Sequence, residues 1–301
     1  MTQTIAFLAC PGTLPTSALR RKDAFEHDHQ IAALRAGLAG SGVDVVEVDW
    51  RAPLEELTAF PLALIGTPWD YAEAKEEFLA RLEALQAAGV KVCNPVDVVR
   101  WNADKLYLRD LAQRGAPSIP TLWAEAPGAG DIAAAFEHFG CDRVVVKRRV
   151  GAGAVGQASF TRGDPAMAAW RMEQPAMIQP FLPAIQTEGE LSFIFVDGAL
   201  SHALIKRAQP GDYRIQSSYG GTETAHSPAP GDRAAAEGVM ALLPFAQAPL
   251  YARIDMVRLP SGGLALIEAE LIEPYLYPLQ GPGFAQAMAR AVLGRLRFDP
   301  I

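Results

Sequence analysis

Carboxylates interrupt two apolar runs near the end of the sequence. Asp255 lies inside the run Tyr251–Val257, and Glu268 and Glu270 lie inside the run Leu264–Ile272. Side chains alternate along a strand, so Glu268 and Glu270 share a face. Like charges that face each other across strands are destabilising. A divalent cation reverses this effect, because Mg²⁺ binds one or two carboxylates together with phosphate oxygens. The pattern therefore predicts a metal site.

The hairpin turn is predicted at Pro260-Ser261-Gly262-Gly263, between the strands expected over 251–259 and 264–272. If the turn is Ser261-Gly262, Asp255 lies opposite Glu268. Arg253 then lies opposite Glu270. A turn one residue later would place Asp255 opposite Glu270, and the carboxylates would still share a face. A three-residue loop would separate them.

The alternative interpretation of the acidic run is a half-exposed strand with an acidic outer face. In a regular strand, however, Leu264, Leu266 and Ile272 would lie on the same face as the two glutamates. This mixture argues against a face that is simply exposed to solvent.

A glycine loop follows the apolar strand that ends in Lys147. Gly151, Gly153 and Gly156 match the pattern G-x-G-x-x-G. With three cations, Lys147-Arg148-Arg149, just before it, the loop predicts a polyphosphate site. The same pattern occurs in dinucleotide-binding folds, where the loop opens a helix. Here a strand-like segment follows it, which also leaves open a tight hairpin with a solvated basic end.

Further cations stand in an apolar context in the second half of the chain. Lys206-Arg207 ends an apolar strand, and Arg214 lies in a loop flanked by glycines. Arginine in such a loop suits a developing phosphate charge. An ordinary polar surface loop is the alternative interpretation.

In the first third, Trp69-Asp70-Tyr71 follows a strand and precedes a helix. Ligands bind at the carboxyl ends of such strands, although Asp70 could equally cap the helix. We do not expect His27 and His29 to form a metal site, because residues two apart on a helix do not face together.

The elements that must position these residues change in type along the chain. Strand and helix patterns alternate up to Asn94-Pro95, which predicts a small parallel α/β layer. The expected strands are 5–8, 43–48, 62–65 and 91–93, and the expected helices are 26–38 and 72–88. Paired strands dominate thereafter, which predicts an α+β arrangement.

In that second part we expect a helix over 104–114, a strand over 143–149 and a closing helix over 281–296. Asp197-Gly198 is a strong two-residue turn between strands 191–196 and 199–206. The second hairpin joins the two runs that carry the carboxylates.

The composition limits the class of protein. The chain has 301 residues, 50% of them hydrophobic, and a net charge of −7. This balance predicts a packed globular protein and argues against a nucleic-acid surface. Cys10, Cys93 and Cys141 form no C-x-x-C pair, so we expect reduced thiols rather than a disulfide framework or zinc site. With neither a signal-peptide pattern nor a long apolar run, we expect a cytoplasmic protein without a membrane span.

The ordered set of motifs resembles the ATP-grasp superfamily, in the branch of bacterial glutathione synthetase and the ribosomal-protein glutamate ligases. The resemblance rests on Asn102-Ala103-Asp104-Lys105, Val145-Val146-Lys147 with the glycine loop, Gln179-Pro180-Phe181-Leu182, Arg207, Arg214, Asp255 and Glu268-x-Glu270. Three further segments are similar to the O-ureido-D-serine cyclo-ligases, which form D-cycloserine: Trp69-Asp70-Tyr71, Asn94-Pro95 with Arg100-Trp101-Asn102, and Ile272-Glu273-Pro274.

The resemblance implies an α/β N-terminal domain over residues 1–94 and two ATP-grasp subdomains over 95–178 and 179–301, with the nucleotide between two antiparallel sheets. It implies ATP and Mg²⁺, with two ions, as cofactors. Lys105, Lys147, Gly151, Gly153, Gly156, Gln179, Phe181, Leu182 and Glu188 would bind ATP. Asp255, Glu268 and Glu270 would hold the metal, and Arg207 and Arg214 would be catalytic. Trp69, Asp70, Tyr71, Arg253 and Glu273 are candidates for substrate contacts.

The chain departs from the family pattern at two positions. Glu270 stands where relatives usually have Asn, and Glu190-Leu191-Ser192 stands where many relatives carry an Asp-x-Arg pattern. The first departure bears on the metal geometry and the second on substrate recognition.

The expected activity is ATP-dependent ligation through an acyl phosphate, either as cyclisation of an amino-acid derivative such as O-ureidoserine or as ligation of two molecules. The partner would be a small carboxylic acid with an amine or amino-oxy nucleophile, and a homo-oligomer is expected by analogy. Two other classes remain open at this point: a nicotinamide-dependent oxidoreductase that uses the glycine loop, and a nucleotide-binding protein without catalysis.

Overall fold

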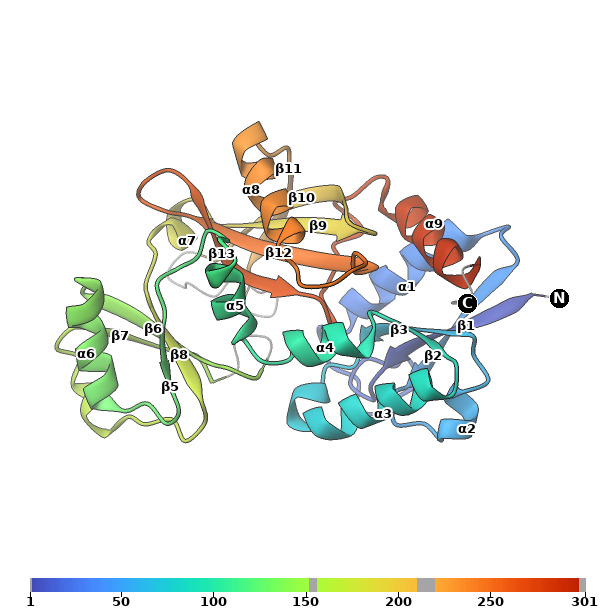
Figure 1. Cartoon of the computed structure of the whole chain (residues 1–301), viewed down its shortest axis with the longest axis horizontal. Coiled ribbons are helices and arrows are strands. Elements are labelled where there is room, and N and C mark those ends of the chain that lie inside the picture. The colour runs from blue at the N-terminus through green and yellow to red at the C-terminus, as the bar shows by residue number, and fades with distance from the viewer. Residues whose placement is uncertain (1, 152–155, 210–219, 298–301) are drawn as a thin grey trace.

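A computed structural model describes residues 2–151, 156–209 and 220–297 of the chain. Figure 1 shows three sheets in an elongated molecule, with the N-terminal sheet and the central sheet at opposite ends and the C-terminal sheet between them. None of the helices within these ranges is both long and apolar enough to cross a membrane.

The N-terminal sheet is parallel. Its strands lie in the order β2-β1-β3-β4. Alternation along β1 sends Ile5 and Phe7 into a core with α1, and sends Ala6 and Leu8 into a core with α3. The elements of this layer are β1 (Gln3–Ala9), α1 (Phe25–Leu38), β2 (Val43–Asp49), α2 (Leu54–Leu57), β3 (Leu62–Thr67), the 3₁₀ helix η1 (Tyr71–Glu73), α3 (Lys75–Ala87) and β4 (Lys91–Cys93).

The central sheet is antiparallel, in the order β5-β8-β6-β7. It is covered on one face by α6, whose Ile132, Ala135 and Phe136 pack on Val144 and Val146 of β6. Its elements are β5 (Leu122–Ala124), α6 (Ala129–Phe139), β6 (Arg143–Arg148), β7 (Ala158–Thr161), the 3₁₀ helix η2 (Pro165–Ala169) and β8 (Ala176–Pro180).

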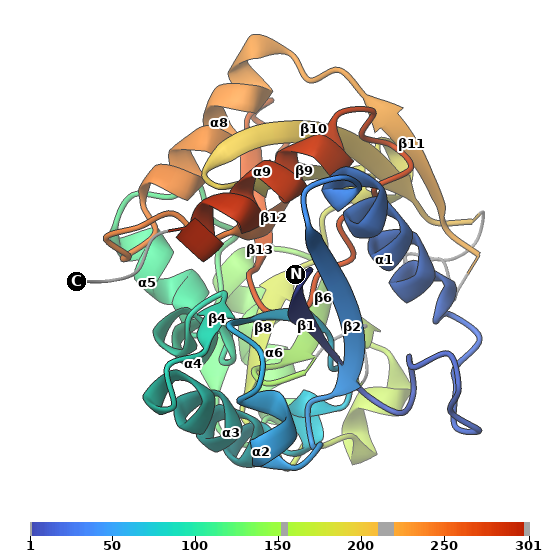
Figure 2. The ribbon, with the colours of Figure 1, turned by 90° about the vertical axis from the view of Figure 1, so that its right-hand side faces the viewer.

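The C-terminal sheet is also antiparallel, in the order β11-β10-β9-β12-β13. One face packs on α5 and α8, and part of the other packs on α1 and α9, which lie against each other in Figure 2. The remaining elements are α4 (Val96–Asn102), α5 (Tyr107–Gln113), α7 (Ala184–Thr187), β9 (Glu190–Val196), β10 (Ala199–Arg207), β11 (Thr222–His226), α8 (Pro230–Ala241), β12 (Tyr251–Arg258), β13 (Leu264–Glu270) and α9 (Phe284–Arg297).

The fold class predicted from the sequence is confirmed: a parallel α/β layer is followed by two antiparallel sheets. The Asp197-Gly198 turn is also present, with positive φ at both residues. The helix expected over 104–114 is shorter, because Asp104 and Lys105 belong to the connection between α4 and α5. All three cysteines are free.

The expected domain boundaries do not coincide with the sheets. β8 runs across the boundary expected at 178/179 and belongs to the central sheet. α4 and α5, expected in the central unit, contribute Val98, Tyr107 and Leu111 to the core of the C-terminal sheet. A division of the chain into three units therefore stays a proposal.

His202 of β10 connects the C-terminal sheet to the segment that follows β13. Its Nε2 donates to the Tyr277 carbonyl oxygen over 3.0 Å, which leaves Nδ1 to accept from Ser201 Oγ. Tyr277 lies in the left-handed region at φ 47°, which is uncommon for a residue other than glycine. Burial lowers the pKa of His202 to about 4, with the hydrogen bonds to the backbone opposing it.

We predict that His202 makes the protein sensitive to mild acid. The unfolded chain takes up a proton near the usual histidine pKa of about 6.5, whereas the folded chain takes it up near 4. The stability contributed by neutral His202 is therefore full above about 6.5 and is lost as the pH falls toward 4. His202→Gln keeps a donor for Tyr277 and should make the melting temperature fall less between pH 6.5 and 4.5, as measured by circular dichroism. Exposed His138→Gln is the control. Equal slopes for all three proteins would contradict this prediction.

Candidate active site

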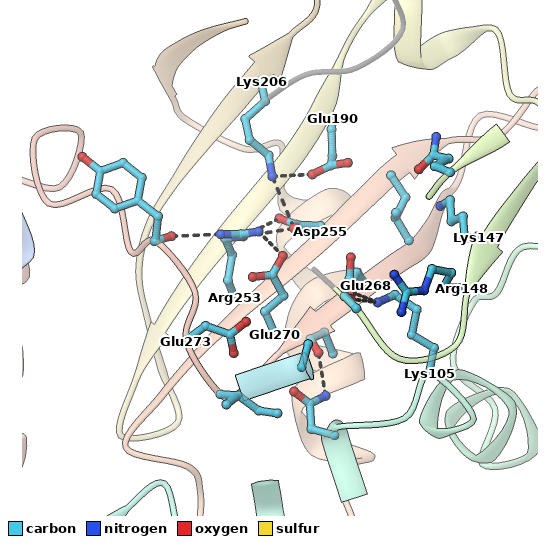
Figure 3. A pocket seen from close by; sticks show the side chains of 18 of the residues that line it. Lys105, Lys147, Arg148, Glu190, Lys206, Arg253, Asp255, Glu268, Glu270 and Glu273 are labelled. Carbon is cyan, nitrogen blue, oxygen red and sulfur yellow. Dashed lines mark hydrogen bonds and ion pairs between the residues drawn. The ribbon is translucent and has the colours of Figure 1, made fainter. Parts of the chain in front are cut away.

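A cavity of about 580 Å³ lies where the three sheets meet. This volume is typical of small-molecule sites. Its lining includes charged side chains from all parts of the chain: Arg21, Asp23, Glu26, Glu73, Lys105, Lys147, Arg148, Glu190, Lys206, Arg253, Asp255, Glu268, Glu270 and Glu273. Figure 3 shows most of these around one space, with Lys105, Lys147 and Arg148 on one side and the strands of the C-terminal sheet on the other.

The carboxylates of the hairpin share the cavity, although the turn differs from both two-residue alternatives. Leu259 N donates to Gly263 O, so the loop contains three residues, with Gly262 at φ 93°. Such a loop alone would shift the register by one residue. A β-bulge between the Asp255–Glu268 and Met256–Leu266 pairs shifts it back, and Ile267 is the extra residue. Asp255 therefore lies opposite Glu268.

The bulge also corrects one expectation about the faces of β13. Leu264 and Leu266 do not share the face of Glu268; they pack with Ala269 and Leu271 in the core against α5 and α8. Ile267 and Glu268, which are adjacent in sequence, both line the cavity. The extra residue lets β13 begin in the core and then present its carboxylates to the opposite side.

Cross-strand neighbours on the cavity face form a buried network of charges. Asp255 accepts from Ser192 Oγ and from Arg253 Nε, the latter over 3.0 Å. Lys206 Nζ lies 3.3 Å from Asp255 and 2.5 Å from Glu190. Pairing is expected of buried charges, because an unpaired charge away from water is costly.

The pairing sets the protonation of this network. Burial raises the pKa of Asp255. The opposite effect of the Arg253 and Lys206 charges is larger, so the pKa of Asp255 lies below its usual value. The Lys206 pKa is lowered by burial and by Arg253, but the carboxylates Asp255 and Glu190 raise it above its usual value overall. Both groups are therefore charged at neutral pH.

A glycine permits the close approach of the first residues of β9 to the end of β10. Gly189 has φ 102°, and a Cβ at this position would lie 2.4 Å from the Lys206 carbonyl oxygen. Any side chain would therefore push the strands apart. Its absence lets Glu190 lie directly opposite Lys206 in the sheet.

Glu270 pairs with Arg253, the residue directly opposite on β12. Burial raises the pKa of Glu270 to about 7, with Arg253 opposing this shift. Arg253 also donates to the Tyr275 carbonyl oxygen over 3.1 Å. The glutamate that stands in place of the usual Asn is thus accompanied by an arginine that neutralises it.

Lys105 reaches the same carboxylates from the connection between α4 and α5. Its Nζ lies 2.9 Å from Glu268 Oε1 and donates to Gly151 O over 2.7 Å. Its backbone is held by Arg149, whose carbonyl accepts from Lys105 N and whose guanidinium pairs with Asp104 at 2.6 Å. The connection, Gly151 and β13 therefore meet at Lys105.

Lys147 points into the cavity because of its position in β6. Val144 and Val146 face α6, so Val145 and Lys147 face the cavity. Burial lowers the pKa of Lys147, and no carboxylate among the described residues lies within ion-pair distance. This cation is available to an anionic ligand.

At the far end of β8 the lining becomes apolar. Gln179, Phe181 and Leu182, for which the resemblance implies ATP contacts, line the cavity. Arg143 stacks 3.8 Å from the Phe181 ring centroid, and Gln179 donates to Thr121 Oγ1 over 3.0 Å. Glu188, in contrast, is paired with Arg258 at 3.0 Å and lies outside the lining formed by the described residues.

The three hairpin carboxylates offer the hard oxygen ligands that Mg²⁺ prefers. Among the residues that the structure describes, no three acidic, histidine or cysteine side chains are arranged as a ready metal cluster. Each carboxylate has a cationic partner instead: Lys206 and Arg253 for Asp255, Lys105 for Glu268 and Arg253 for Glu270. The chemistry of the donors fits the ion, and the ion would take over part of this neutralisation.

Several known proteins are similar to this chain in sequence and in structure. The family model for the N-terminal domain of D-cycloserine synthetase DcsG matches residues 5–94. The cycloserine biosynthesis protein DcsG of Streptomyces lavendulae is 27% identical over 289 residues, which cover 90% of this chain and 95% of that protein. The crystal structure of D-cycloserine synthetase DcsG superposes with a TM-score of 0.82 at 25% identity, covering 98% of this chain and 100% of that one.

Two more distant structures share the fold. D-alanine–D-alanine ligase from Bacillus anthracis, solved in complex with ATP, has a TM-score of 0.68 at 12% identity and covers 98% of this chain and 97% of its own. The ATP-grasp ligase PsnB, solved with a precursor variant, Mg and ADP, has a TM-score of 0.65 at 14% identity and covers 99% and 100%. The chain is an ATP-grasp ligase.

The oxidoreductase hypothesis finds no support in the fold of this ligase. β6 and β7, the strands on either side of the glycine loop, are antiparallel neighbours, so the loop does not open a helix. Gly151 lines the cavity, Gly156 is described but is not part of the lining, and Gly153 lies outside the described residues. Arg214, predicted as catalytic, also lies outside them.

Arg207 of the ligase is placed differently from the expectation. It is exposed at the end of β10 and lies outside the described lining of the cavity, whereas its neighbour Lys206 is buried in it. Alternation explains this, because Ala203 and Ile205 pack toward α8 and Arg207 shares their face. Alternation places the two cations on opposite faces, but both faces carry apolar residues, so the sequence alone does not show which cation faces the cavity.

Of the candidates in the first third, Trp69 and Tyr71 line the cavity of the ligase, and Arg21 stacks 5.0 Å above the Trp69 ring. Asp70 instead pairs with Arg51 and accepts from Trp50 Nε1 over 2.8 Å, and it does not cap the following helix. The sequence patterns assign no site role to Lys206 or Glu190 and do not single out the loop residue Arg21, because the positions of all three depend on the tertiary fold.

We predict that Asn102 is essential to the placement of β13. Its Nδ2 donates to Ala269 O over 2.7 Å and its Oδ1 accepts from Leu271 N over 2.8 Å, on either side of Glu270. Asn102→Ala leaves both buried backbone groups unpaired and should lower the free energy of unfolding by about 1–3 kcal/mol in urea titrations. Exposed Gln113→Ala should change it by less than about 0.5 kcal/mol. A similarly small change for Asn102→Ala would contradict the assignment.

Proposed function

We propose that this ligase uses Mg-ATP to activate the carboxylate of a small amino-acid derivative and then joins it to a nitrogen of the same molecule. The observation that carries the proposal is the combination, in one cavity, of two lysines from the nucleotide side with three hairpin carboxylates and a buried arginine–lysine pair. Sites for phosphoryl transfer work mainly through positioning and charge neutralisation, and this set of groups supplies both.

The proposed roles follow from position in the cavity. Lys105 and Lys147 contact the phosphates, since both cations face the space beside the glycine loop. Phe181 and Leu182 contact adenine at the apolar end. Asp255, Glu268 and Glu270 hold Mg²⁺, which when bound neutralises phosphate charge during transfer.

Lys206 and Arg253 replace Arg207 as our candidates for binding the transferred phosphoryl group. Both are buried and line the cavity next to the carboxylates, and both are charged. They act on the equatorial oxygens, where charge develops during transfer.

The reaction has two steps. A carboxylate oxygen of the substrate attacks the γ-phosphorus, and the bond to the bridging oxygen breaks with its electron pair leaving on ADP. The nitrogen lone pair then attacks the acyl carbon, the bond to the phosphate oxygen breaks and the nitrogen loses a proton. In a cyclo-ligase the two reacting groups belong to one molecule, so orientation within the cavity replaces binding of a second substrate.

The choice of cyclisation rests on the relatives. The proteins that match nearly the whole chain at 25–27% identity are named for D-cycloserine, a cyclic product. We therefore propose O-ureidoserine or a similar amino-oxy acid as substrate. Ligation between two molecules on the same fold is the competing possibility.

The first experiment measures ADP release with a panel of amino acids that includes O-ureidoserine, with and without added amines. We expect release with a single acid, and a cyclic product lighter than the acid by one water in the mass spectrum. With O-ureidoserine this first product is the N-carbamoyl ring, and hydrolysis of the carbamoyl group to CO₂ and ammonia then gives cycloserine. Hydroxylamine should trap the acyl phosphate as a hydroxamate. Release that needs a separate amine would favour intermolecular ligation, and absence of release with every acid would refute the proposal.

The second experiment tests Glu268. Glu268→Gln removes the charge opposite Asp255 and the partner of Lys105, and should reduce turnover by at least about 100-fold while the melting temperature stays close to that of the parent. Exposed Glu56→Gln should be fully active. Near-normal turnover of Glu268→Gln would remove this residue from the metal site.

A further inference from the structure

Glu273 is a cavity carboxylate without a cationic partner among the described residues. It lies three positions after Glu270, beyond the end of β13, and lines the same cavity. Its acidic neighbours Glu190, Asp255, Glu268 and Glu270 are each paired with a lysine or an arginine. Figure 3 shows Glu273 at the side of the cavity away from Lys147.

The surroundings of Glu273 disfavour an uncompensated charge. Burial, followed by the negative charge of Glu270, raises the pKa of Glu273 to about 8. Lys105 is the cation that acts on it most strongly, but that ammonium is paired with Glu268. A half-buried carboxylate is stabilised when a cation reaches it, so the cavity is complementary to a positive group at Glu273.

The walls around this end of the cavity are aromatic. Tyr71 comes from the N-terminal layer, and Tyr275 and Tyr277 follow Glu273, with their ring centroids 4.4 Å apart. Burial and then the charge of Glu273 raise the pKa of Tyr71 well above its usual value, so its hydroxyl stays protonated. An ammonium group is favoured both by a carboxylate and by aromatic faces.

We propose that Glu273 binds the α-ammonium group of the substrate and so restricts the ligase to amino acids. This inference rests on the proposed function. In an α-amino acid a single carbon separates the ammonium group from the carboxylate. A residue that binds the ammonium must therefore lie close to the groups that activate the carboxylate, and Glu273 lies near Glu270 in the same cavity lining that contains Arg253.

The proposal gives Glu273 a role different from that of the hairpin carboxylates. Those residues are paired with protein cations, Asp255 and Glu270 with cations of the same sheet and Glu268 with Lys105, so their charge is balanced before any ligand binds. The negative charge of Glu273 is neutralised only when a cationic ligand binds. Its contribution should consequently appear in the recognition of the acid and not in the binding of ATP.

The test compares O-ureidoserine with its deamino analogue, which carries hydrogen in place of the ammonium group. kcat and KM are measured by ADP release, and affinity is measured independently by calorimetric titration in the presence of ADP and Mg²⁺. The parent should prefer the amino acid by about 10- to 100-fold, the strength of a charge-assisted contact. Glu273→Gln should lose this preference, mainly through KM, while KM for ATP stays within about 2-fold.

Two variants complete the comparison. Glu273→Asp keeps the charge and should retain part of the preference. Glu73→Gln changes another glutamate of the cavity lining, one that is exposed to solvent, and should leave the preference unchanged.

A Glu273→Gln protein that still prefers the amino acid by the parental factor would overturn the inference, as would loss of the preference in Glu73→Gln alone. If no acid supports ADP release, the proposed function fails, but the calorimetric preference still decides whether Glu273 recognises ammonium.

Discussion

The pairing of Asp255 with Arg253 and Lys206 is the interaction on which the site depends. Asp255 is 2% exposed on β12, an interior strand of the five-stranded sheet, where a lone carboxylate would be costly. Its partners come from the same strand and from β10, and Ser192 of the intervening strand donates to it. Side chains of opposite charge therefore lie next to one another across the cavity face, from β10 through β9 and β12 to β13.

This constraint extends beyond the C-terminal sheet. Glu268 has no cation opposite it in the sheet, because Asp255 occupies that position. Its partner Lys105 comes from the connection between α4 and α5, which is fixed in turn by the Asp104–Arg149 pair at the end of β6. The neutralisation of the second carboxylate thus requires the central sheet to lie beside the hairpin, and the cavity between them follows from that.

Much of the fold could be predicted from the sequence, because it depends on local signals. The apolar strands, the helices and the Asp197-Gly198 turn follow from periodicity and turn chemistry, and the carboxylates were identified by their apolar surroundings. The hairpin register was harder. The loop residues alone do not show that a three-residue loop is compensated by a bulge at Ile267, because the bulge is selected by packing on both faces of β13.

The misplaced residues have a related cause. Arg207 was favoured over Lys206 through its resemblance to relatives, although strand alternation places it on the outer face. The resemblance implies an ATP contact for Glu188, but Arg258 from β12 pairs with it, a contact that links residues 70 positions apart. Pairing across such separations is a property of the tertiary fold, and no local pattern reports it.

The N-terminal layer is held to the hairpin by side chains that satisfy backbone groups at the strand ends. Asn94 donates to Tyr251 O and Leu271 O and accepts from Leu250 N, and the Tyr251 hydroxyl donates to Ile65 O and Ile272 O. These bonds join the end of β3, which leads to Tyr71, with the end of β13, which leads to Glu273. A small amino acid spans only a few ångströms, so its ammonium and carboxylate groups can be recognised together only if these two strand ends keep a fixed separation. Rigid attachment of the N-terminal layer to the hairpin is therefore a requirement of recognising a small substrate, while the central sheet, which supplies Lys147, has only to approach the phosphates.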